Sequence, residues 1–342
     1  MKQRNYKLDL LRFFAANLVV LQHLAFIEWG DSAVFGRFRS IADLGYLGVD
    51  VFFALSGFVI ARSAINRNAT DFLISRFLRI FPGLIFAGVL SAICVQVSVA
   101  PVHTNFFGDI STIFLLNDPT RTQSSNPVFW TLVYEFKFYI AIALLLVAKK
   151  NQAQHLRVFA LVWLFSSFFL GPNGGGVLGG LLIPNFAACF VFGIILSAIK
   201  TKRELVRVLP FLFISMILIL NTRIQEWLSF DSDRQHRNSQ WEIAASLLIL
   251  FSLFTYCALS SKTGGRFQRL SYKLGAYSYP IYLLHFTPMI TFLAGFYKIT
   301  HNAYVSLAVS YLGMLAVSII FVEWIEPRMK RSFKKLLVDE AG

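Results

Sequence analysis

The chain has 342 residues, of which 56% are hydrophobic and only 15% are charged. Soluble domains carry roughly a quarter charged residues and somewhat under half apolar ones, so this composition excludes a cytosolic enzyme, a disordered chain and a coiled coil. The net charge of +14 comes from short basic clusters between long apolar runs rather than from one soluble face, which argues against nucleic-acid binding. The sequence therefore predicts a protein that crosses a membrane many times.

Ten apolar stretches are long enough, or nearly so, to cross a bilayer, which takes about 20 mainly apolar residues. The predicted spans are 8–28, 44–61, 81–101, 128–148, 157–171, 181–199, 208–221, 241–260, 274–297 and 304–325. The longest connections are 102–127 and 222–240. The sequence thus predicts an all-α polytopic helical bundle over 1–330 and a basic, then acidic, tail over 331–342. Each of the three cysteines lies in an apolar run, a pattern that gives no metal-ligand spacing.

Basic residues set the expected orientation. With the N-terminus inside, the inner segments hold 23 Lys and Arg and the outer segments hold 7. Lys and Arg accumulate in cytoplasmic loops, so both termini are predicted to be cytoplasmic.

The first span carries ionisable residues, which are costly at membrane depth and are functional candidates by default. Arg12 and His23 are eleven residues apart, which puts them on one helix stripe within about 20° and roughly 16 Å apart. Arg12 then lies near the cytoplasmic end and His23 in the outer third. The structural alternatives are an Arg12 contact with lipid headgroups and a His23 contact with a backbone carbonyl.

Other spans add a carboxylate and a second histidine. Glu135 enters the fourth span from outside at a depth similar to that of His23, Asp50 enters the second, and His285 lies near the middle of the ninth. An imidazole can take a proton from a hydroxyl while a carboxylate fixes its tautomer. Proton-coupled transport needs the same pair, so the pattern fits an enzyme or a carrier. Lys137 either snorkels or pairs with Asp50.

The segment after the second span, 62–79, is predicted to be a basic cytoplasmic loop. Arg76 and Arg79 are three residues apart, hence neighbours on one helical face. Guanidinium groups match phosphate oxygens, so this pair is a candidate phosphate site. Alternatively, these arginines serve only to keep the loop on the cytoplasmic side of the membrane.

Six short motifs around these residues resemble, in order, those of the membrane acyltransferase family 3. The first is Asp9-Leu10-Leu11-Arg12 with His23 after ten intervening residues. The others are 45–58 (Gly-Val-Asp, Phe-Phe and Ser-Gly-Phe), 76–82 (Arg-Phe-Leu-Arg), 130–135 (Trp-Thr-Leu then Glu, with Thr131 where Ser is usual), 278–285 and 326–327.

The resemblance implies transfer of an acyl group, most often acetyl, from cytoplasmic acyl-CoA to a hydroxyl of an extracytoplasmic glycan or lipid-linked sugar. Acyl-CoA is then a co-substrate, with no permanently bound cofactor. His23 is expected to act as general base with Glu135 as its partner. Arg76 and Arg79 are expected to hold the donor phosphates, with Arg12 and Ser56 further along the donor passage. Residues expected to line the substrate site are Asp50, Phe52, Phe53, Trp130, Tyr282 and His285.

Two other functions compete with this one. A proton-coupled transporter or lipid-linked-sugar flippase would use His23 and Glu135 as a relay, but it does not need a cytoplasmic Arg motif. Repeated halves with broken helices, frequent in transporters, are not evident. A scaffold subunit of a polysaccharide synthase is the third reading.

Overall fold

The computed structural model describes residues 5–25, 38–97, 124–148, 153–171, 176–229, 238–260 and 267–339. Within these ranges the chain is helical, without strands. Among the described residues, nine helices are long and apolar enough to cross a membrane, or ten if the bent pair α12–α13 forms one span. The all-α, multi-pass membrane architecture is therefore confirmed.

The first half of the described chain contains six longer helices and short helical turns. The elements are α1 (Tyr6–Ala25), α2 (Arg39–Asp43), a 3₁₀ turn (Leu44–Leu47), α3 (Gly48–Ala64), α4 (Ala69–Val97), a second 3₁₀ turn (Pro127–Phe129), α6 (Trp130–Val147), α7 (Ala153–Leu170), α8 (Gly176–Leu182) and α9 (Pro184–Ser197).

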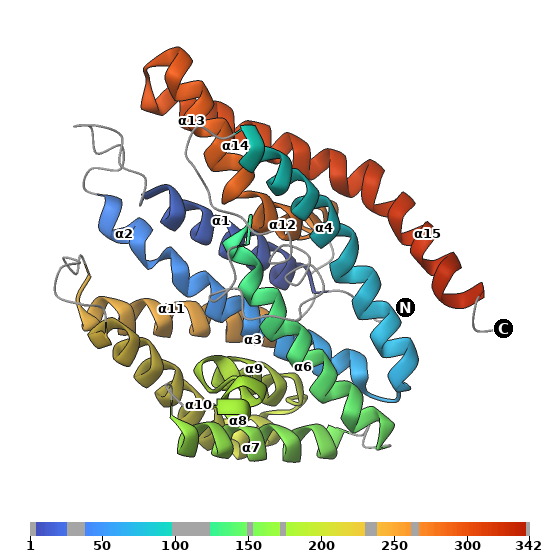
Figure 1. Ribbon diagram of the computed structural model, residues 1–342. Coiled ribbons are helices and arrows are strands. Elements are labelled where there is room, and N and C mark those ends of the chain that lie inside the picture. Colours follow the sequence, from blue (N-terminus) through green and yellow to red (C-terminus); the bar gives the residue numbers. More distant parts are fainter. Residues whose placement is uncertain are drawn as a thin grey trace.

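The second half continues with α10 (Lys202–Ser229), α11 (Gln240–Leu259), α12 (Phe267–Leu284), α13 (Thr287–Thr300), α14 (Ala303–Ile320), a π-helical turn (Phe321–Ile325) and α15 (Glu326–Asp339). Figure 1 shows α7, α8, α9 and α10 at one side of the molecule and α14 and α15 at the other, with α1 and α3 between them.

The helix boundaries differ from the predicted spans at several places. The segment 62–79 was expected to be a loop, but α4 begins at Ala69, so Arg76 and Arg79 lie within a helix of 29 residues. The fifth and seventh predicted spans were too short, and α10 runs from Lys202 to Ser229. The described part of the tail, 331–339, is helical. Of the two longest predicted connections, 102–123 and 230–237 lie outside the described residues. These helices continue past their apolar cores because polar residues also sustain a helix once it has started.

Close helix contacts centre on glycines. A Cβ at Gly193 of α9 would lie 1.9 Å from the carbonyl oxygen of Ala54 in α3, and one at Gly57 would lie 2.0 Å from that of Phe190. Small residues permit such backbone approach in membrane bundles. Gly57 is therefore a helix-packing position, and the backbones of α3 and α9 lie in close contact.

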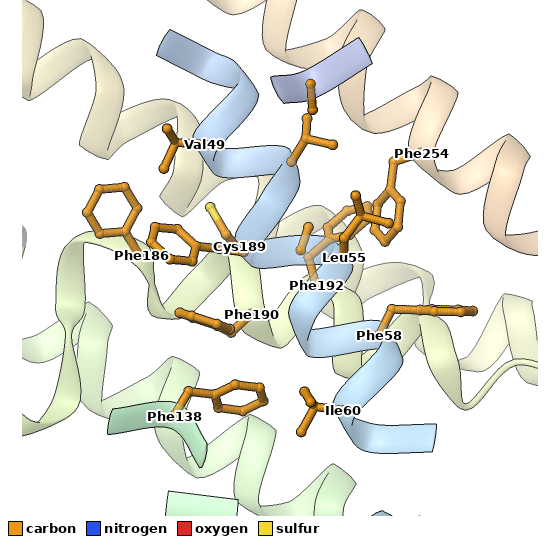
Figure 2. Close-up of a cluster of buried hydrophobic side chains, with 14 of the residues drawn as sticks. Val49, Leu55, Phe58, Ile60, Phe138, Phe186, Cys189, Phe190, Phe192 and Phe254 are labelled. Carbon is orange, nitrogen blue, oxygen red and sulfur yellow. The ribbon is translucent and has the colours of Figure 1, made fainter. Parts of the chain in front are cut away.

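Aromatic rings fill the space beside this pair. Phe186, Phe190 and Phe138 lie in a row along one side of α3 (Figure 2). The ring centroids of Phe138 and Phe190 are 4.5 Å apart, and those of Phe53 and Phe186 are 4.7 Å apart. Aromatic pairs in this range add stabilisation beyond their buried area.

The predicted ninth span is a broken helix. α12 ends at Leu284 and α13 begins at Thr287, and the two axes differ by 71°. Pro288 stands in the first turn of α13, where a proline needs no hydrogen-bond partner for its nitrogen. His285 lies at the break itself.

Candidate active site

A cavity of about 1220 Å³ opens among α1, α3, α4, α6 and α12. Ligand pockets usually measure roughly 300–1000 Å³, so the space suits a large ligand. α3 lines it from Val49 to Arg62, which is about 20 Å of helix. Because Phe52 and Ser56 precede Arg62 along α3, the cavity is apolar and hydroxyl-lined at one end and basic at the other.

Five arginines line the cavity: Arg12, Arg62, Arg67, Arg76 and Arg79. The guanidinium groups of Arg76 and Arg79 lie against aromatic rings. The Arg79 guanidinium lies 5.3 Å from the ring centroid of Tyr279, and that of Arg76 lies 5.7 Å from the ring of Phe72. Arg12 also contacts Asp9, at 3.5 Å. Stacking on a ring fixes a guanidinium without neutralising it, so the cavity can attract an anion.

Glu135 lines the same cavity rather than bonding to His23. Its Oε1 accepts hydrogen bonds from the Ser56 hydroxyl at 2.9 Å and from the Tyr139 hydroxyl at 2.5 Å. These are its hydrogen bonds within the described part of the chain. The pairing of Glu135 with His23 inferred from span depth is therefore not the one that the structure has.

His23 instead contacts the second histidine of the predicted site. Its Nδ1 lies 3.0 Å from the Val19 carbonyl oxygen and 3.3 Å from Nε2 of His285. His285 is fully buried, and its Nδ1 lies 2.5 Å from the Tyr282 carbonyl oxygen.

The carbonyl contacts assign the tautomers of both rings. Because a carbonyl oxygen only accepts, each Nδ1 carries the proton in the neutral imidazole. Nε2 of His285 then accepts from His23. Nε2 of His23 keeps its lone pair, and no described residue donates to it. That atom is the one available to take a proton.

Asp50 lies outside the cavity lining. It is 1% exposed and forms an ion pair with Arg223 of α10, with 3.2 Å between Oδ1 and Nε. The Cys189 thiol also donates to it, at 3.3 Å. Arg223 was counted with the outer connection because it follows the apolar core of its span. Lys137 does not pair with Asp50; it donates to the Gly180 carbonyl at 2.8 Å.

The remaining predicted residues divide between the cavity and its surroundings. Phe52, Phe53 and Tyr282 line the cavity. Trp130 packs outside it, with its ring centroid 5.3 Å from that of Phe186 and 5.5 Å from that of Tyr134. Tyr282 connects the two regions, because its hydroxyl accepts from Thr131 in the cavity wall while its carbonyl oxygen contacts His285.

Several participants were not foreseen. Tyr139 and Tyr279 line the cavity and hold Glu135 and Arg79, and Asn126 contacts the segment that carries His285. Tyr139 stands four residues after Glu135 on α6, a helical spacing that could have suggested the contact. Asn126 has no such signal, since its partners are distant in sequence.

Comparison with known proteins identifies the family. Residues 5–323 match the family model described as an acyltransferase domain, so the chain belongs to this acyltransferase family. It is 33% identical over 144 residues to "Acyltransferase MdmB" of Streptomyces mycarofaciens, covering 39% of this chain and 37% of that protein.

Two other relatives carry more specific names. An "O-acetyl transferase" of Shigella phage Sf6 is 28% identical over 157 residues (42% of this chain, 46% of that protein). A "Putative peptidoglycan O-acetyltransferase YrhL" of Bacillus subtilis strain 168 is 28% identical over 189 residues (48% and 27%). The matches span less than half the length of these curated relatives. No solved structure gave a significant match. The family match favours an enzyme over the carrier and scaffold alternatives.

Proposed function

We propose that this protein is a membrane O-acyltransferase that moves an acyl group, acetyl in the first instance, from acyl-CoA to a hydroxyl of an extracytoplasmic glycan. The observation that carries the proposal is the cavity, which combines five arginines with a hydroxyl- and carboxylate-lined end. Such a space fits a ligand with several phosphates at one end and a slender, uncharged arm at the other. Acyl-CoA has this construction.

The donor's phosphates are assigned to Arg76 and Arg79, with Arg62, Arg67 and Arg12 nearby. Arg forks bind phosphate with paired, charge-assisted hydrogen bonds. The pantetheine arm then extends along α3 past Ser56 and Phe52. Its thioester reaches the Thr131–Tyr282 hydroxyl pair. Tyr282 contacts His285, which contacts His23, and neither histidine is among the residues that line the cavity.

The chemistry is an exchange of one ester for another. The acceptor hydroxyl gives its proton to Nε2 of His23, and its oxygen attacks the thioester carbonyl. The carbon–sulfur bond breaks, and the proton passes to the departing CoA thiolate, which leaves an O-acyl ester and free CoA. His285 accepts the hydrogen bond of His23 Nδ1 and so holds the ring in the required tautomer.

The acceptor class and the sidedness of the reaction rest on other arguments. Two relatives are named as O-acetyltransferases, one of them of peptidoglycan. The basic-residue distribution supports an inward-facing donor end, in the inner membrane, with His23 toward the outside. A glycan or lipid-linked sugar is therefore the proposed acceptor.

Donor binding tests the proposal directly. Isothermal titration of the purified protein with CoA should show that the Arg76→Ala, Arg79→Ala double variant binds at least tenfold more weakly, because each lost charge-assisted contact costs roughly 1.5–3 kcal/mol. Arg207→Ala is the matched control, since Arg207 is exposed on α10 and does not line the cavity. Wild-type CoA affinity in the folded double variant would refute the donor assignment.

A further inference from the structure

The break between α12 and α13 is hydrogen-bonded to Ser125 and Asn126, which lie just before α6 in the chain. Leu283 lies at the end of α12, where carbonyl groups lose their helical partners. Nδ2 of Asn126 donates to the Leu283 carbonyl oxygen at 2.9 Å. The Thr287 hydroxyl, in the first turn of α13, donates to the Ser125 carbonyl oxygen at 2.6 Å. The adjacent residues Ser125 and Asn126 thus form hydrogen bonds on both sides of the break.

Two more hydrogen bonds join the same segments one turn away. The Thr131 hydroxyl donates to the Tyr282 hydroxyl at 3.0 Å, and the Tyr282 hydroxyl lies 3.3 Å from the Val128 carbonyl oxygen. All four contacts link 125–131 with 282–287. We call this set of hydrogen bonds the clasp.

Asn126 is the most constrained member of the clasp. Its side chain is fully buried, and its Nδ2 also donates to Ser91 of α4 at 3.0 Å. Only a donor can face the Leu283 carbonyl, so the orientation of the amide is fixed. Oδ1 is buried without a hydrogen-bond partner among the described residues, a cost that a purely space-filling residue would avoid.

We propose that Asn126 is a positioning residue, which fixes the α12–α13 break so that His285 meets His23. The residues of the break are fixed at both ends: His285 is bonded to Tyr282 by its own Nδ1, and Asn126 and Thr287 tie the flanking residues to the start of α6. A shift of about 1 Å would separate His285 Nε2 from His23 Nδ1, now 3.3 Å apart. The catalytic meaning of this contact rests on the proposed function; the contact itself does not.

The clasp also connects the two ends of the site. α6 carries Thr131 of the clasp in its first turn and Glu135 further along, so one helix contacts both Tyr282 of the clasp and Ser56 in the donor cavity.

Asn126→Asp tests this role, because it keeps the shape of the side chain and removes both N–H donors. Ser91→Ala is the matched control, which removes the other Asn126 contact but keeps the bond to Leu283. We expect Asn126→Asp to lower acetyl turnover about tenfold to hundredfold, with CoA affinity within twofold of wild type, because small misplacements of catalytic groups have such effects. Ser91→Ala should stay within threefold.

A double variant separates positioning from general destabilisation. If Asn126 acts through His285, adding Asn126→Asp to His285→Ala should cost little more turnover. Losses that multiply would overturn the proposal, as would a parallel weakening of CoA binding.

A measurement without turnover keeps this test apart from the proposed function. The protein would be labelled with ¹⁵N-histidine, and the ring-nitrogen signals of His23 and His285 would be assigned with His23→Ala and His285→Ala. The chemical shifts of these signals should change in Asn126→Asp and remain unchanged in Ser91→Ala. Unmoved signals would overturn the positioning role. If the chemical shifts change in Asn126→Asp but the wild-type protein transfers no acetyl group, the positioning role would be supported and the proposed function refuted.

Discussion

The ion pair of Asp50 and Arg223 gives the sharpest stability prediction. Their side chains are 1% and 4% exposed, and they join α3, the main wall of the cavity, to α10. Removing one member of a buried pair costs about 3–5 kcal/mol, because the other is left charged and unpaired. The two single variants should differ. Arg223 without Asp50 still has Glu226 and the Asn185 carbonyl oxygen, whereas Asp50 without Arg223 keeps only the Cys189 thiol.

Asp50→Asn is therefore expected near the lower end of that range and Arg223→Met near or above its upper end. In a thermal unfolding assay of the detergent-purified protein this corresponds to a loss of about 5–10 °C in Tm. The double variant Asp50→Asn, Arg223→Met should recover much of the loss, because it buries no lone charge. Arg207→Met, on the exposed face of α10, serves as the control.

Either of two results would refute this reasoning. If Asp50→Asn keeps the wild-type Tm but no longer binds CoA or turns over, Asp50 contacts substrate, as its motif first suggested. If the double variant is as unstable as the sum of the two single variants, the pair is not coupled.

The remaining predictions concern the reacting groups. Glu135→Gln keeps an acceptor for Ser56 and Tyr139 but replaces two charge-assisted hydrogen bonds with neutral ones. At a loss of about 1 kcal/mol for each hydrogen bond, acetyl turnover should fall at least tenfold. CoA affinity should be unchanged or higher, since a negative charge leaves an anion-binding cavity; a tenfold weaker affinity by titration would contradict this. His23→Ala should lower single-turnover acetyl transfer by about 10²–10⁴ and leave CoA binding intact. His285→Ala should lower acetyl transfer less than His23→Ala does, because it removes the partner of the base and not the base itself. Equal losses of CoA binding in His23→Ala and His285→Ala would contradict these roles.

Hydropathy and motif order predicted most of the architecture. Apolar stretches located the membrane helices because bilayer thickness fixes their length. The limits of the helices were less predictable: α4 starts twelve residues before the expected third span, because its first turns are polar yet helical.

The pairing of site residues was the harder part. Arg76, Arg79, Ser56, Glu135 and Tyr282 share one cavity as expected. The partner of His23 was not predictable from depth along separate helices, because which residues meet depends on helix rotation and on the break at His285. Asp50 lies three residues before the cavity-lining Phe53, on nearly the same side of α3, yet its side chain contacts Arg223 of α10 and does not line the cavity. A single sequence does not specify such rotations.

Glycan analysis of a deletion strain tests the central claim most directly. Surface glycans from the wild-type strain, the deletion strain and strains complemented with wild-type or His23→Ala protein would be compared by mass spectrometry for ester-linked acyl groups. The proposed function predicts that an O-acyl modification, acetyl in the first instance, disappears on deletion, returns with the wild-type gene and does not return with His23→Ala. Unchanged O-acylation in the deletion strain, or full restoration by His23→Ala, would contradict it.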